Sequence, residues 1–168
     1  MNFAFLDSLS TWLKTTKLSW AVIHYPWLWP AAETLHFIGL ALLVGSVALI
    51  DLRMLGMAKQ LPLRPLHRLL FWGLAGFGIN VITGILFFAG EPSQYVHNSV
   101  FWLKLLFILL AGINALLFYA TGIFRDTEDL GPGEDAPLGA KIIAGVSLFL
   151  WVGVMYFGRM LPFLGEAF

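Results

Sequence analysis

Long apolar runs alternate with short polar segments along most of the chain, and their lengths predict four membrane-spanning helices. A spanning helix needs about 20 mostly apolar residues to cross roughly 30 Å of hydrocarbon. Runs of this kind lie at about residues 30–50, 69–89, 100–124 and 138–161. The predicted fold is therefore all-α: one transmembrane domain over residues 1–168, built as a bundle of four spans.

The segment before the first run has a different periodicity. Over residues 3–15, apolar side chains such as Phe5, Leu9 and Trp12 recur at helical spacing while polar residues occupy the opposite face. This pattern predicts an amphipathic helix that lies in the membrane interface. Because the chain does not open on a basic stretch followed by an unbroken apolar run, we expect no signal peptide.

Local signals mark where the middle spans end and begin. Gly90, Glu91 and Pro92 form a turn signal directly after the second apolar run. Asn98, followed by Ser99, is a residue type that favours the N-cap of a helix and precedes the third run. These signals predict a short, turn-like connection between the second and third spans.

Basic residues in the connecting segments predict the orientation. The side with the first and third loops carries six of them, Arg53, Lys59, Arg64, Arg68, Arg125 and Lys141. The other side carries three, Lys14, Lys17 and Arg159. Cytoplasmic loops are enriched in Lys and Arg, so we expect a multi-pass protein of the bacterial inner membrane with both termini in the periplasm.

Composition limits the classes of partner. With 59% hydrophobic and 12% charged residues, the chain must have the lipid bilayer as its main solvent. Its formal net charge of zero excludes a nucleic-acid partner, which would require a basic surface. The absence of cysteine excludes disulfides, thiolate metal sites, iron–sulfur clusters and covalently attached c-type haem.

Ionisable side chains within the spans are candidates for function, because burying them in a membrane is costly. The candidates are Glu33, His36, Lys104 and Arg159, all in the outer half of the predicted bundle. We predict a structural ion pair between Glu33 and Lys104. An alternative is that Glu33 and His36, which are three residues apart on one helix face, belong to a single site.

The second span carries a stripe of small and polar residues at helical spacing. The stripe consists of Gly73, Gly76, Asn80, Thr83 with Gly84, and Phe87. Small residues let helix backbones approach closely in membranes, so the stripe predicts a helix-packing face. Asn80 and Asn114 are expected to form hydrogen bonds between helices.

His36 is the candidate metal ligand. Membrane b-type cytochromes hold haem between helices through axial imidazoles, and cationic side chains can meet the haem propionates near the surface. In this hypothesis His36 is one axial ligand, His97 or Met155 is the other, and Arg159 binds the propionates. Alternatively, His36 forms a structural hydrogen bond to a neighbouring helix or handles protons or another metal.

Four segments carry a family resemblance: AAETLHFIGLALLVGSVALIDLRMLG, FWGLAGFGINVITGILFF, NSVFWLKLLFILLAGINALLF and GRMLPF. Over nearly its whole length the chain resembles a family of small bacterial four-helix integral membrane proteins, known only as a domain of unknown function. The resemblance implies a four-span inner-membrane protein and assigns no activity.

The functional prediction is a small haem-b-binding electron-transfer protein or subunit, without catalytic residues or independent catalytic activity. Quinone or a periplasmic redox partner would exchange electrons at its outer side. The alternative is a cofactor-free accessory or scaffold subunit that assembles as a homo-oligomer or within a larger inner-membrane complex. A transporter is less favoured, because the cytoplasmic half offers few polar groups beyond Asp51, Arg53 and Tyr119.

Overall fold

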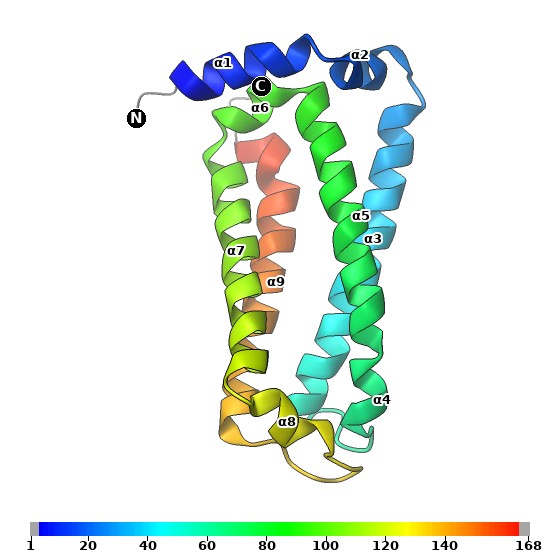
Figure 1. Ribbon diagram of the computed structural model, residues 1–168, viewed down its shortest axis with the longest axis vertical. Helices are drawn as coiled ribbons and strands as arrows, with labels where there is room; N and C mark the ends of the chain where they lie inside the picture. Colours follow the sequence, from blue (N-terminus) through cyan, green and yellow to red (C-terminus); the bar gives the residue numbers. More distant parts are fainter. Residues whose placement is uncertain (1–3, 165–168) are drawn as a thin grey trace.

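Four long helices run side by side in the computed structural model, which describes residues 4–164. They are α3 (Leu28–Met54), α5 (Leu69–Gly90), α7 (Ser99–Ala120) and α9 (Leu138–Leu164) (Figure 1). Each belongs to a segment long and apolar enough to cross a membrane. The predicted all-α, four-span fold is confirmed, and the exposed apolar faces of these helices contact the lipid bilayer.

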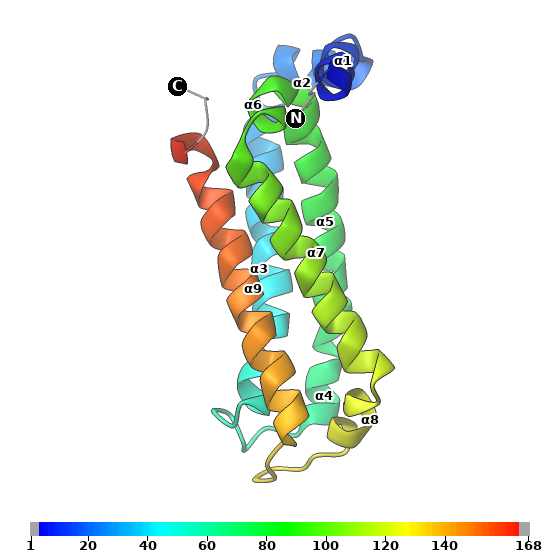
Figure 2. The same cartoon turned by 90° about the vertical axis from the view of Figure 1, so that its left-hand side faces the viewer.

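The end of the bundle where α3 begins and α9 ends, here called the terminal end, carries three short helices. These are α1 (Ala4–Lys14), α2 (Lys17–His24) and α6 (Pro92–Val96). Helices α1 and α2 lie across the tops of the spans, which confirms the predicted N-terminal helix (Figures 1 and 2). Lys14 donates a 3.1 Å hydrogen bond from Nζ to Ser93 Oγ and so ties α1 to α6.

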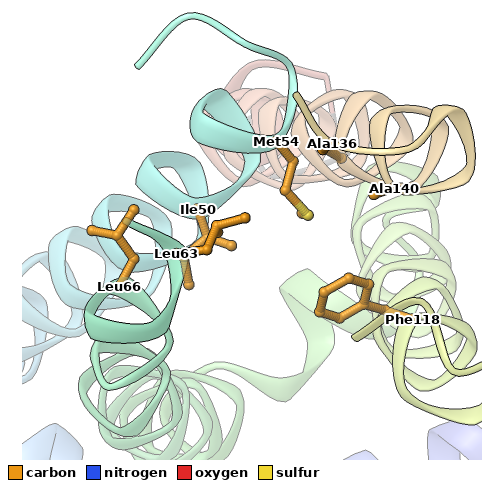
Figure 3. Close-up of a cluster of buried hydrophobic side chains, with 8 residues drawn as sticks. Ile50, Met54, Leu63, Leu66, Phe118, Ala136 and Ala140 are labelled. Carbon is orange, nitrogen blue, oxygen red and sulfur yellow. The ribbon is translucent and has the colours of Figure 1, made fainter. Parts of the chain in front are cut away.

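The four spans are organised as two helix pairs. Helix α3 packs along α5, and α7 packs along α9, whereas α5 and α7 do not form a packed pair in the part of the chain that the structure describes (Figures 1 and 2). The pairs are joined mainly through α3 and α9. A buried apolar cluster contributes to this joint and includes Ile50, Met54, Phe118 and Ala140 (Figure 3).

Helices α3 and α5 approach closely where two glycines face each other. A Cβ atom on Gly39 would lie 2.8 Å from the Gly76 carbonyl oxygen, which is closer than a side chain can come. Gly73 also faces α3, where its Cβ would lie 3.4 Å from the Ser46 Cβ. The predicted packing stripe is therefore confirmed at Gly73 and Gly76, while Gly84 faces open space.

The opposite end, here called the loop end, carries α4 (Leu63–His67) and α8 (Ile123–Glu128), and its connecting segments are held by a buried arginine. Helix α3 continues past the predicted end at residue 50, and Arg53 is 0% exposed. Its guanidinium donates to Gly131 O at 2.8 Å, to Glu134 O at 3.2 Å and to Leu61 O. Arg53, which we counted among the basic residues of the connecting segments, is thus a buried structural anchor.

Helix α7 begins as predicted but ends earlier. The Asn98 side chain accepts a 2.9 Å hydrogen bond from Val100 N, which confirms the predicted cap. The helix stops at Ala120, four residues before the predicted end at 124. The reason is Gly122, whose φ of +80° lies in the left-handed region that glycine adopts without strain, and α8 starts in a new direction after it.

An exposed ion-pair cluster joins the two connecting segments of the loop end and predicts a pH effect. Asp135 lies 2.8 Å from Lys141 Nζ and 3.2 Å from Lys59 Nζ. Hydrogen bonds from these two lysines lower the pKa of Asp135 below its ordinary value of 3.8. A carboxylate with a depressed pKa stabilises the fold above its ordinary pKa, and this contribution is lost as pH falls through the folded-state pKa.

We expect Asp135→Asn to lower the melting temperature at neutral pH, with a difference from the wild type that shrinks as the pH falls below 3.8. Thermal unfolding of both proteins in detergent across this pH range measures the effect. Asp126→Asn, at an exposed acidic position of α8, is the control. A difference in melting temperature between Asp135→Asn and the wild type that stays constant with pH would contradict the stabilising role of the ionised Asp135.

Candidate functional site

The candidate site centres on His36, a partly buried residue in the terminal half of α3. Its Nδ1 lies 2.7 Å from the Thr83 hydroxyl on α5, and its ring lies 5.5 Å from the ring of Phe87. The Thr83 hydroxyl also lies 2.8 Å from Ile79 O and 3.3 Å from Asn80 O of its own helix. When it donates its single proton to one of these carbonyls, it accepts from His36, and in that tautomer Nδ1 carries the ring proton and Nε2 keeps a free lone pair.

The local sequence of α5 explains how Thr83 reaches His36. Gly76, Asn80, Thr83 and Phe87 share the helix face that packs on α3, and Gly76 brings the two backbones together. Within residues 4–164 Asn80 lacks the expected hydrogen bond between helices, and its Nδ2 donates to Gly76 O of its own helix at 2.9 Å. Asn114 does form one, from Nδ2 to Ile143 O on α9 at 3.1 Å.

The structure does not form the predicted ion pair between Glu33 and Lys104. The Glu33 carboxylate accepts a 3.1 Å hydrogen bond from Trp29 Nε1 one turn earlier in α3. Glu33 and Lys104 lie on different helix pairs, because α3 packs along α5 and α7 packs along α9. Lys104 on α7 is partly buried and lies beside Gly158 of α9.

His97 and Arg159, two of the other predicted haem-binding residues, lie at the terminal end. His97 follows α6, and its Nε2 lies 3.0 Å from Asp7 Oδ1 on α1. Arg159 on α9 is exposed, with its guanidinium carbon 5.1 Å from the centre of the Phe163 ring. Met155 is partly buried one turn before Arg159. The structure thus directs His97 toward α1 and leaves Met155 within the terminal half of a span.

The remaining histidines have other surroundings. His24 lies at the end of α2, where its ring stacks on Trp20 and its Nδ1 lies 2.9 Å from Trp20 O. His67 lies at the loop end, with its ring 4.8 Å from the ring of Phe124. Neither of these contacts involves His36.

The bundle contains a second buried polar group, which the sequence placed just beyond the first span. Asp51 follows the predicted end of that span at residue 50, but α3 continues and Asp51 is only 4% exposed. Its Oδ2 has no hydrogen-bond partner among residues 4–164. An acidic residue two positions before a buried arginine was the available signal, but the hydropathy pattern ended the first span at residue 50 and so left both residues outside it.

A family model matches residues 10–164, nearly the whole chain, and its description is "Family of unknown function (DUF6644)". No curated protein and no solved structure matches the chain. The match covers α2 to α9 and all the candidate residues of the spans. This multi-pass membrane protein therefore belongs to DUF6644, a family of unknown function.

Proposed function

We propose that this chain is a small membrane electron-transfer protein that binds haem b through His36. The observation that carries the proposal is the 2.7 Å hydrogen bond between His36 and Thr83. Histidines that bind metals usually donate their second ring N–H to a fixed acceptor, which sets the tautomer and the ring orientation. Thr83 supplies such an acceptor, and the lone pair on Nε2 remains available for iron.

A porphyrin fits the donor set better than a protein-only metal site. Within residues 4–164, no group of three or more His, Cys, Asp or Glu side chains could hold a metal ion. Haem requires only one or two axial ligands from the protein, because the porphyrin nitrogens supply the others. His36 supplies one axial ligand in this proposal, and Met155 is the preferred second ligand because His97 is paired with Asp7.

The surrounding residues have distinct roles in the proposal. Bound haem b would supply reversible one-electron transfer. Thr83 holds the imidazole proton at Nδ1, and Phe87 packs close to the ring. Lys104 and Arg159 would bind the anionic propionates, since ammonium and guanidinium groups form strong hydrogen bonds with carboxylates.

The proposed setting is the bacterial inner membrane, with the loop end in the cytoplasm. Removing the buried Arg53 from the six basic residues of that side leaves five, against three on the terminal side. The asymmetry still favours cytoplasmic loops and periplasmic termini. Quinone or a periplasmic redox protein would then exchange electrons at the terminal end, where His36 and Arg159 lie.

The test is a reduced-minus-oxidised visible spectrum of haem-replete protein in detergent. We expect bands of low-spin haem b that His36→Ala abolishes. Thr83→Val should weaken haem binding by about 10–100-fold, because the ring loses the group that fixes its tautomer. Thr34→Val is the matched control, since Thr34 is exposed and its hydroxyl donates within α3 to Pro30 O, at 2.9 Å.

A flat spectrum from folded, haem-replete wild type would overturn the proposal, and so would bands that persist in His36→Ala. The accessory-subunit alternative would then stand. It is supported by Gly45 and Gly78, where a Cβ would have no atom within 4 Å and where another membrane helix could approach closely.

A further inference from the structure

A cavity of about 440 Å³ lies between the two helix pairs, in the loop-end half of the bundle. All four spans contribute to its walls. It extends along α3 from Leu43 to Met54, which are eleven residues and so about 16 Å apart. His36 is not among the lining residues, so this cavity is separate from the proposed haem site.

Asp51 places an unused hydrogen-bond acceptor in the cavity wall. The residue is 4% exposed, and its buried Oδ2 has no partner in the described part of the chain. Arg53 is not its partner among residues 4–164, where the guanidinium donates to three loop carbonyls instead. Buried carboxylate oxygens normally have a donor, so Oδ2 calls for one from a bound molecule.

The cavity opens toward the bilayer. Its lining includes Leu74 on α5 and Tyr119 on α7, which are 70% and 48% exposed. These two helices do not pack against each other over the residues described (Figure 1). A ligand would therefore enter sideways from the lipid, which requires a lipid-soluble molecule.

The walls favour a flat aromatic ligand. Phe77, Phe118 and Trp151 provide aromatic surfaces, while Ala111 and Gly112 leave room on α7. Aromatic rings pack well at their edges and faces against other rings, whereas a lipid acyl chain has no donor for Asp51. Ser147 of α9 adds a hydroxyl group to the same cavity wall.

We propose that this cavity binds a lipid-soluble phenol, such as a hydroquinone, whose O–H group donates to Oδ2 of Asp51. The site is additional to the proposed haem site and does not require haem.

The test measures equilibrium binding of an alkylated hydroquinone to the full chain in lipid nanodiscs by titration calorimetry. The dimethyl ether of the same compound has the same ring but no donor, and we expect it to bind about tenfold more weakly or worse. Asp51→Asn should weaken hydroquinone binding in the same way. Equal affinity for the hydroquinone and its ether would overturn the proposal.

Two glycine variants test whether the hydroquinone binds in this cavity. Gly112 lines the cavity and Gly78 does not, yet a Cβ on either would have no atom within 4 Å. Gly112→Phe should abolish binding and Gly78→Phe should retain it. Unchanged binding in Gly112→Phe would overturn the assignment, even if Asp51→Asn failed to fold. His36→Ala should bind hydroquinone normally, which separates this outcome from a failure of the haem proposal.

Discussion

Replacing Arg53 by Met should destabilise the protein by about 3 kcal/mol, because three hydrogen bonds from a charged donor are lost together. The fully buried guanidinium joins α3 to the segment before α4 and to the segment before α9, through Leu61, Gly131 and Glu134. Met keeps much of the side-chain length without leaving a charge in the interior. The decrease in the free energy of unfolding therefore measures how strongly Arg53 anchors the two segments.

Thermal unfolding in detergent measures this effect, and limited proteolysis should show earlier cleavage of residues 55–62 and 129–137. Arg53→Lys should not rescue stability, since an ammonium lacks the planar fork that serves several carbonyls at once. Arg64→Met is the control, because Arg64 pairs with Asp129 at 2.8 Å on the exposed surface. Such pairs contribute about 0–1 kcal/mol. Equal melting temperatures for Arg53→Met and Arg64→Met would contradict the anchoring role.

The four spans could be predicted because the bilayer thickness fixes both their length and their apolar character. The N-cap at Asn98 could also be predicted from the sequence, since capping is a local interaction between a side chain and the next turn. The end of α7 was harder to place. Apolar residues continue to Phe124, and only the left-handed conformation of Gly122 stops the helix at Ala120.

The polar contacts could not be predicted in the same way, because depth in the membrane does not determine which helices are neighbours. Glu33 and Lys104 were placed at similar depth, but α3 pairs with α5 and α7 pairs with α9. His36 was identified as a candidate ligand, whereas its partner Thr83 lies 47 residues away. Arg53 bonds carbonyls as far as 81 residues away, which no local pattern reveals.

The second prediction with a large effect concerns the crossing of α3 and α5. We expect Gly76→Ala to destabilise the protein by about 2–3 kcal/mol, because the new methyl group would collide with backbone that cannot rotate away. It would meet the Gly39 carbonyl oxygen and lie 2.8 Å from Leu43 N. Gly78→Ala on the same helix is the matched control, since its methyl group would face open space.

Both changes replace glycine by the residue with the highest helix propensity, a gain of about 1 kcal/mol that cancels in the comparison. The difference in melting temperature between the two variants therefore reports the interhelical contact alone. The crossing also holds Thr83 against His36. Gly76→Ala should accordingly reduce haem retention while Gly78→Ala leaves it unchanged. Equal stability of the two variants would mean that α3 and α5 can separate without cost, and the hydrogen bond at His36 would then lack the rigid support that the proposed function requires.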